Sequence, residues 1–363
     1  MTLLSAPANI LIAGEYAVTR PGGVGIALAV GPRATVRIED AMHTPESARA
    51  FRRALHHASR SATPAIPGLE VRTVPEGVAG ARTSIVPPVL REIADFTADR
   101  DDATRENGAP PPSTTVTIDT SPFFEPRTGR KRGLGSSAVA VVLLTAAVLH
   151  LSGINPLRHR EALLRIAVRA HRMFQGGRGS GYDVTSSILG GAIRFVGGEP
   201  PRWDQLDLVD RWEAEGVRMM TWSGPSPVAS SPAVEAFDRR YPPGSDADAL
   251  INRFNTLVHT LAEADSWTAF TAALQAAREL GQVIGREIGV PAELPGNITA
   301  SITKALDGRN ADWTAKPVGA GDEQAVVFLR GYDPDEIQKL ATRGFSELLP
   351  ERDGLRREEV PLG

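Results

Sequence analysis

The stretch that decides the fold is Arg130-Lys131-Arg132-Gly133-Leu134-Gly135-Ser136-Ser137-Ala138, which runs directly into the apolar residues 139–151. Glycines let the backbone approach a phosphate without an intervening Cβ, and the free N–H groups and macrodipole at a helix start attract negative charge. The two serines add hydroxyls that can bind a phosphate oxygen or a metal ion. This stretch therefore predicts an anion site at the start of a helix, with an ordinary capped helix after a glycine turn as the alternative.

The composition limits the partners of the chain. Its 363 residues and 42% apolar content suffice for a full core and suggest about two domains. Forty Lys and Arg against 43 Asp and Glu leave a formal net charge of −3, so no overall charge favours nucleic acid or an anionic membrane. The absence of cysteine excludes disulfides and thiolate sites. With no signal-peptide pattern and no apolar run of ~18 residues, we expect a cytoplasmic monomer or homodimer.

Periodicity and turn residues predict alternating strands and helices. Strands are expected at 10–13, 24–30, 35–39, 114–118, 192–196, 217–222 and 325–329. Helices are expected at 44–60, 84–97, 139–151, 156–174, from about 182 to 189, and at 231–240, 246–264, 266–286, 297–307 and 333–343. The glycines and prolines of residues 197–201 are the best candidate boundary, which predicts domains at 1–198 and 199–363.

A second glycine-dense segment, residues 176–181, precedes Asp183 and another expected helix. A carboxylate near a helix start is favoured by the dipole, so Asp183 is either a helix cap or a group that accepts or orients a substrate proton. Two glycine-rich helix starts, one cationic and one acidic, suit phosphoryl transfer, which needs positioning and charge stabilisation more than covalent chemistry. His171, late on the preceding helix, is expected to cap carbonyl groups rather than to act as a base.

Two further segments carry weaker signals. Residues 6–18 predict a strand that ends at Gly14-Glu15-Tyr16, with an ordinary strand and turn as the alternative. Residues 316–324, Lys316-Pro317-Val318-Gly319-Ala320-Gly321-Asp322-Glu323-Gln324, predict a glycine turn before a strand. Ser223 and Ser226 follow another expected strand and are candidate substrate contacts.

Taken in order, these segments resemble the GHMP kinase family, and most strongly its phosphomevalonate kinases. The likeness spans roughly residues 6–330 and rests on A-P-x-x-I-L-I-A-G-E-Y-A-V, K-R-G-L-G-S-S-A and G-S-G-Y-D-V. It implies an α+β fold of two domains, a ribosomal-protein-S5-like nucleotide-binding domain at 1–198 and a ferredoxin-like domain at 199–363.

The resemblance also implies an activity: transfer of the γ-phosphoryl of ATP, with Mg²⁺, to the anionic small molecule 5-phosphomevalonate in isoprenoid precursor synthesis. Three alternatives stay open, which are mevalonate kinase or another GHMP acceptor, an inactive ligand-binding homologue, and a related diphosphate decarboxylase. Neither a nucleic acid nor a membrane is implied as a partner.

The site residues implied by the resemblance fall into three groups. The phosphate-binding loop would comprise Gly133, Leu134, Gly135, Ser136, Ser137 and Ala138, with Ser137 also contacting Mg²⁺. Asp183 would orient or deprotonate the acceptor, and Lys131 would supply a catalytic cation. The acceptor would be bound by Asn9, Glu15, Tyr16, Arg130, Arg178 and Ser180, and residues 319–321 would support the site from the second domain.

The chain departs from the family pattern in three places. Asn9 stands where mevalonate and phosphomevalonate kinases carry a lysine, and no other lysine precedes Lys131. We expect Lys131, Arg130, Arg132 or Arg178 to replace that cation, or Asp183 and Mg²⁺ to act without it. Residues 319–324 read G-A-G-D-E-Q where the family usually continues G-A-G-G-G, and Arg172 occupies the place of a metal-binding glutamate in mevalonate kinases.

Overall fold

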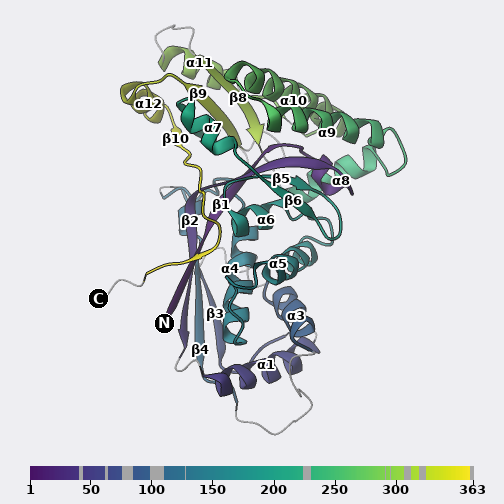
Figure 1. The fold of residues 1–363 in the computed structure, drawn as a ribbon, viewed down its shortest axis with the longest axis vertical. Helices are drawn as coiled ribbons and strands as arrows, with labels where there is room; N and C mark the ends of the chain where they lie inside the picture. The colour runs from purple at the N-terminus through teal and green to yellow at the C-terminus, as the bar shows by residue number, and fades with distance from the viewer. Residues whose placement is uncertain are drawn as a thin grey trace.

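The chain folds around two antiparallel-rich sheets that lie one above the other in Figure 1. This computed structural model describes residues 1–40, 44–61, 64–75, 85–98, 110–126, 128–223, 230–290, 292–294, 296–305, 312–318 and 324–359. The strands β1 and β2 run from the foot of the molecule up to the junction of the two sheets (Figure 1). They therefore connect the core of the first domain with the boundary to the second.

The first sheet has seven strands, in the order β11-β1-β2-β4-β3, with β5 joined to β2 and β6 joined to β5. Its strands are β1 (Thr2–Ala13), β2 (Val24–Asp40), β3 (Leu69–Val74), β4 (Thr114–Asp119), β5 (Ala192–Val196), β6 (Arg202–Leu206) and β11 (Arg356–Arg357). Only the β3–β4 pair is parallel; the other pairs are antiparallel. The expected strands at 24–30 and 35–39 are one continuous strand, β2.

Helix α4 (Ser136–Leu151) is the centre of the first domain. Nearly all of its side chains are buried, because its sequence is apolar on every face and it lies between the sheet and other helices. The surrounding helices are α1 (Pro45–Ser59), α3 (Val86–Thr97), α5 (Arg160–Phe174) and α6 (Tyr182–Leu189), with the short turns η1 (Ala17–Thr19) and η5 (Ser121–Phe123). The packing of α4 fixes where its first turn, and hence the glycine loop, can lie.

The second sheet has four strands in the order β10-β7-β9-β8, all antiparallel. These are β7 (Val217–Ser223), β8 (Asp312–Val318), β9 (Gln324–Arg330) and β10 (Phe345–Glu347). The associated helices are α7 (Leu208–Ala214), α8 (Ser230–Arg240), α9 (Ala247–Glu263), α10 (Trp267–Ile288), α11 (Gly296–Ala305) and α12 (Pro334–Ala341). The long pair α9 and α10 lies across the top of the molecule, with α10 against β8 and α9 reaching β2. No described helix has the length and apolar character needed to cross a bilayer.

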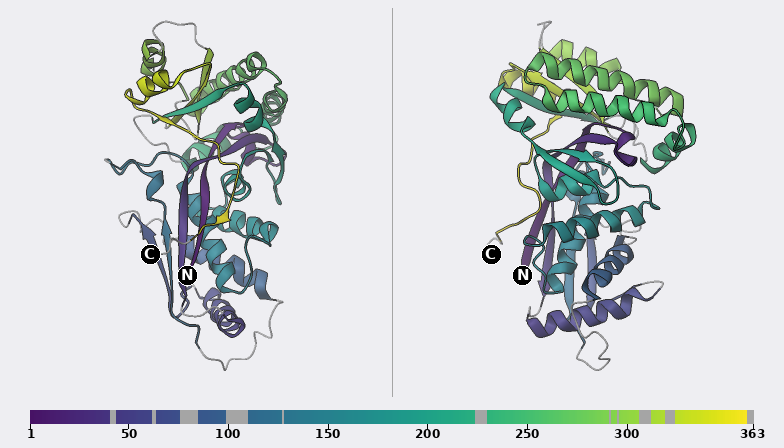
Figure 2. Two further views of the ribbon diagram at one scale, coloured as in Figure 1. Left: turned by 60° about the vertical axis from the view of Figure 1, so that its left-hand side comes forward. Right: turned by 45° about the vertical axis from the view of Figure 1, so that its right-hand side comes forward.

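The chain changes sheet after Leu206 rather than at residue 198. Residues 197–201 form the turn of the β5–β6 hairpin, and β6 pairs with β5 along its whole length. Beyond β10 the chain returns down the first domain, as both views of Figure 2 show. There Glu351 N–H donates to the Ala29 carbonyl and Leu355 N–H to the Ile188 carbonyl. The first domain therefore includes a C-terminal strap that the boundary prediction did not anticipate.

Candidate functional site

The first part of the site is the start of α4. Gly135 precedes the helix in the left-handed conformation, with φ 76°. Val139 N–H bonds back to the Gly135 carbonyl, but among the described residues nothing accepts a hydrogen bond from the N–H groups of Ser136, Ser137 or Ala138. Three open donors lie at the positive end of a sixteen-residue helix that has no acidic residue in its first turn. This geometry suits the binding of an anion.

Asn9 lies directly beneath this loop. Its N–H donates to the Leu134 carbonyl over 3.3 Å, and its side chain is only 2% exposed. A Cβ on Gly135 would come within 2.5 Å of Asn9 Nδ2, so glycine is required there by contact as well as by conformation. Asn9 Nδ2 also donates to Ser187 Oγ on α6 at 3.0 Å. The residue in place of the family lysine is thus a buried link between β1, the glycine loop and α6.

Asp183 and Ser137 are connected through His171. The imidazole is fully buried near the end of α5, with Nε2 3.4 Å from Ser137 Oγ and Nδ1 3.6 Å from Asp183 Oδ1. The expectation that His171 caps helix carbonyls is wrong, because both ring nitrogens face side chains of neighbouring helices. Sequence reasoning missed this contact, since nothing local marks a histidine whose partners lie 34 residues before it and on the next helix.

The Asp183 carboxylate is held as an anion by its neighbours. Burial acts to raise its pKa, but the interactions with His171 and with the N–H groups of Val184 and Asp183 itself outweigh burial and leave the pKa below its usual value. Val184 N–H lies 2.9 Å from Asp183 Oδ1. A partly buried carboxylate, with 17% of its side chain exposed, that stays ionised at neutral pH can orient, or accept a proton from, a group that enters the site.

The glycine-dense segment before α6 is braced by Arg172. Its guanidinium donates to the carbonyls of Gly179, Ser180 and Gly198, each at 2.9 Å. Burial lowers the pKa of Arg172, yet the side chain is surrounded by acceptors and serves the loop as a fixed cation. Where mevalonate kinases would place a metal-binding glutamate, this chain has a residue that shapes the backbone.

Several predicted acceptor-binding cations have carboxylate partners. Arg130 is paired with Glu125 at 2.8 Å, and Arg178 with Glu235 of α8. Lys131 is exposed at the end of the same hairpin, where it bridges to Phe124, and no described carboxylate is paired with its ammonium group. Arg132 likewise has no carboxylate partner among the described residues, and its Nε is buried without a hydrogen-bond partner there. Lys131 and Arg132 are therefore the predicted cations that an added anion would not have to attract away from a described carboxylate.

Ser180 and the two apolar residues of the loop are buried. Ser180 Oγ accepts a long hydrogen bond of 3.4 Å from Tyr182 N–H at the start of α6. The side chains of Leu134 and Ala138 belong to the core, so only their backbone groups can face a phosphate. Gly133 shares the left-handed conformation of Gly135, with φ 69°.

The far end of β1 carries a buried ion pair between the domains. Glu15, 8% exposed, is bound through Oε1 to the ammonium group of Lys316 on β8, which also donates to the Pro317 carbonyl. Glu15 Oε2 is buried, and no described group donates to it. The sequence singled out both residues but not their pairing, because they lie 301 positions apart.

Tyr16 completes this end of the strand in a strained turn. It is the one described non-glycine residue with positive φ, at 62°, and Ala17 N–H bonds across it to the Glu15 carbonyl at 2.7 Å. Its ring stacks on Phe237 of α8 at 4.9 Å. Burial, with a smaller effect of Glu15, raises the pKa of Tyr16 and keeps the phenol neutral. Its predicted contact with an acceptor would therefore compete with packing between the domains.

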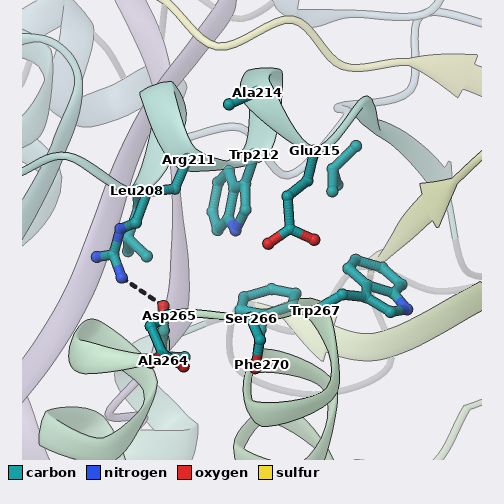
Figure 3. Close-up of a pocket in the computed structure, with 11 residues that line it drawn as sticks. Leu208, Arg211, Trp212, Ala214, Glu215, Ala264, Asp265, Ser266, Trp267 and Phe270 are labelled. Carbon is teal, nitrogen blue, oxygen red and sulfur yellow. Dashed lines mark hydrogen bonds between the residues drawn. The ribbon is translucent and has the colours of Figure 1, made fainter.

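A separate cavity of about 240 Å³ lies in the second domain (Figure 3). Aromatic rings of Trp212, Trp267 and Phe270 line it, with Glu215 pointing toward them. Glu215 is paired with Arg330 at 2.9 Å. None of the predicted site residues contributes to this cavity.

The residues around α4 can hold the phosphates of a nucleotide, but they offer few ligands to a metal. Within the described part of the chain, no cluster of three or more His, Asp or Glu could hold a metal ion. Mg²⁺ commonly binds through one or two protein ligands together with substrate phosphates, and Ser137 could serve in that way. Residues 319–323, with the third glycine motif, and Ser226 lie outside the described residues, as does the side chain of Ser223.

Comparison with known proteins agrees with this geometry. Residues 112–191, from β4 through the loop to the end of α6, match the family model of the GHMP kinases N terminal domain. This part of the chain therefore resembles the N-terminal domain of the GHMP kinases. All of the contacts among Ser137, His171 and Asp183 fall within the matched residues.

One curated relative and two solved structures extend the likeness to most of the chain. Phosphomevalonate kinase of Streptomyces sp. (strain CL190) is 29% identical over 230 residues, which cover 61% of this chain and 56% of that relative. The Lin0012 protein from Listeria innocua superposes with a TM-score of 0.68 at 18% identity, covering 99% of this chain and all of that one. Streptococcus pneumoniae phosphomevalonate kinase, in complex with phosphomevalonate and AMPPNP, gives 0.64 at 15% identity with 99% and 100% coverage. The predicted two-domain α+β fold of the GHMP kinases is confirmed.

Proposed function

We propose that this protein is an ATP-dependent small-molecule kinase of the mevalonate pathway, with 5-phosphomevalonate as the acceptor. The observation that carries the proposal is the placement of an ionised carboxylate, Asp183, one imidazole away from the hydroxyl of an open phosphate-binding helix start. The relative from Streptomyces and the fold shared with the Streptococcus pneumoniae enzyme support the choice of acceptor.

The donor would be bound at the start of α4. The free N–H groups of Ser136, Ser137 and Ala138 would hold its terminal phosphates, and the helix dipole would offset their charge. Mg²⁺, held by the Ser137 hydroxyl and the phosphates, would reduce the charge repulsion between the donor and an incoming acceptor. Exposed Lys131 would add a cation in front of the loop.

Transfer would follow from the position of Asp183. An acceptor oxygen attacks the γ-phosphorus, the bond from that phosphorus to the bridging oxygen breaks, and ADP leaves. If the acceptor is a hydroxyl group, its proton passes to Asp183; if it is a phosphate oxygen, which is mostly deprotonated at neutral pH, Asp183 only orients the acceptor. The size of the Asp183 effect therefore depends on the kind of acceptor.

One observation favours a second candidate, an alcohol acceptor such as mevalonate. Asn9 has no charge, and Arg130, Arg172 and Arg178 are engaged with carboxylates or carbonyl groups. An acceptor that carries a phosphate dianion would have to attract these three arginines away from their partners, or rely on Lys131 and Arg132 alone, whereas an alcohol group would not.

The test is an ADP-release assay with MgATP over mevalonate, 5-phosphomevalonate, homoserine and simple sugars. Highest kcat/KM with 5-phosphomevalonate is the expected result, and a preference for mevalonate would favour the second candidate. Failure to release ADP with any acceptor, from a protein that still binds MgATP, would contradict the kinase proposal and indicate a ligand-binding homologue.

A further inference from the structure

His171 lies where three helices of the first domain meet. It comes from the last turn of α5, Ser137 from the first turn of α4 and Asp183 from the first turn of α6. The ring is fully buried, its Nδ1 has no partner within ordinary hydrogen-bond distance, and it faces Phe174 at 6.2 Å. A histidine kept for packing alone would not need a polar group of a different helix on each side.

The chemistry of the two neighbours determines the proton position on the ring. An ionised carboxylate only accepts hydrogen bonds, so Nδ1, which faces Asp183, must carry a proton to interact favourably. In a neutral imidazole the other nitrogen, Nε2, is then an acceptor, and the Ser137 hydroxyl is the group that donates to it. The hydrogen bonds therefore run in one direction, from Ser137 to His171 to Asp183.

We propose that His171, as the neutral Nδ1–H tautomer, is a positioning residue that orients the Ser137 hydroxyl and the Asp183 carboxylate together. This inference rests on the proposed kinase function. Because Ser137 gives its proton to Nε2, its oxygen lone pairs are left to face a phosphate-bound cation. Because Nδ1–H points at Oδ1, that oxygen is restrained and Oδ2 is left for the acceptor.

The observed distances suit a site that tightens on binding. At 3.4 and 3.6 Å both contacts are longer than a good hydrogen bond, and catalytic hydrogen bonds are often long before ligands bind. One ring thus couples the donor side of the site to the acceptor side.

Two substitutions separate the two halves of this role. The amide nitrogen of His171→Asn lies near the position of Nδ1, so this variant keeps the donor toward Asp183 and loses the partner of Ser137. His171→Gln places its amide near Nε2 and does the reverse. Residues that orient a ligand or catalytic group typically change affinity or activity by ~10–100-fold when removed. His150→Asn is the matched control, since His150 lies at the opposite end of α4 with Nε2 3.4 Å from Thr2 Oγ1.

The experiment measures kcat, the Kd of MgATP by calorimetry, and the ¹⁵N spectrum of histidine-labelled protein. We expect His171→Asn to weaken MgATP binding by ~10–100-fold with kcat largely kept, and His171→Gln to lower kcat by a similar factor with MgATP binding kept. The spectrum of the wild type should show a protonated Nδ1 and an unprotonated Nε2 for His171. The His150 variant should change neither parameter.

Either of two results would overturn the inference: an Nε2–H tautomer in the wild type, or equal losses of kcat and MgATP affinity in both His171 variants, as expected of a purely structural residue. A wild-type protein without kinase activity would instead count against the proposed function. In that case the tautomer and the MgATP affinities still decide the role of His171.

Discussion

The helices α4 and α6 begin in the same way and present opposite charges to the site. Each follows a left-handed glycine, Gly135 with φ 76° and Gly181 with φ 90°, and neither has a side-chain cap. At α4 the first N–H groups are open and no acidic residue lies in the first turn. At α6 the Asp183 carboxylate stands in the first turn and takes the Val184 N–H. One helix start is free to attract an anion, and the other already holds its own.

This difference shows that a glycine before a helix does not by itself determine whether the helix start binds an anion. Glycine supplies the left-handed conformation in both places, and what distinguishes them is the residue that follows and the element pressed against the loop. Asn9 lies under Gly135, whereas Val168 of α5 lies against Gly181, where a Cβ would come within 2.8 Å of Cγ1. A polar contact supports the donor side and an apolar contact supports the acidic side.

The largest effect on activity is expected from the substitution that removes the carboxylate charge at the start of α6. Asp183→Asn should lower kcat by ~10²–10⁴ while MgATP binding is kept, because a positioned acid or base contributes about that factor. Steady-state kinetics and calorimetry measure the two quantities. Asp335→Asn, which changes an exposed first-turn carboxylate of α12, is the control and should leave both unchanged. A variant that keeps more than about a tenth of kcat would make Asp183 a helix cap only.

A large effect on stability is expected from the ion pair between Glu15 and Lys316, which joins the two domains away from the starts of α4 and α6. Lys316→Met leaves Glu15 as a buried, uncompensated charge and should lower the free energy of unfolding by ~3–5 kcal/mol. Adding Glu15→Gln should recover part of that loss. Arg352→Met, which breaks an exposed pair with Asp210, should cost less than ~1 kcal/mol. Chemical denaturation measures all three, and equal losses for the two single variants would mean that the Lys316 pair is not effectively buried.

A smaller effect is expected at Gly135, and a second glycine before α4, Gly129, serves as its control. Gly135→Ala should cost ~1–2 kcal/mol from the left-handed backbone alone, and its Cβ would press on Asn9 and displace the loop. The rise in melting temperature on adding MgATP should then be lost. Gly129→Ala is the control: φ is 67° but nothing lies within 4 Å of the added Cβ. An intact MgATP shift in folded Gly135→Ala would remove the loop from the nucleotide site.

Sequence patterns anticipated the elements with strong local signals and missed those defined by pairing. The apolar run that becomes α4 and the glycine before it predicted both the helix and its open start. Strand β8 was missed because Pro317 interrupts it, and proline is tolerated there only since β8 is at the sheet edge. Strand β6 was missed because its charged sequence has no apolar periodicity. These two strands owe their conformation to the neighbours they pair with.

The side-chain contacts of the site could not be predicted from the sequence either, because they join residues that are far apart along the chain. Asn9 was noticed for the lysine that it lacks, but its partner Ser187 carries no signal except its position one helical turn after Asp183. Glu15 and Lys316 were both singled out, for other roles than their pairing. Local chemistry therefore selected the candidate residues, and only the packing of α4, α5 and α6 shows which of them lie close together.

The smallest expected effect concerns the cations in front of α4. Lys131 is exposed, so its charge is screened by solvent and salt, and Lys131→Ala should lower kcat/KM by no more than ~10-fold. Because the contribution is electrostatic, it should shrink as ionic strength rises, which kinetics at low and high salt would measure. Arg130→Ala is a useful contrast, since it frees Glu125 near the loop and should raise the KM for MgATP through repulsion. A loss above ~100-fold for Lys131→Ala, independent of salt, would instead place this ammonium against the transferred phosphoryl group, as the replacement for the cation that Asn9 cannot supply.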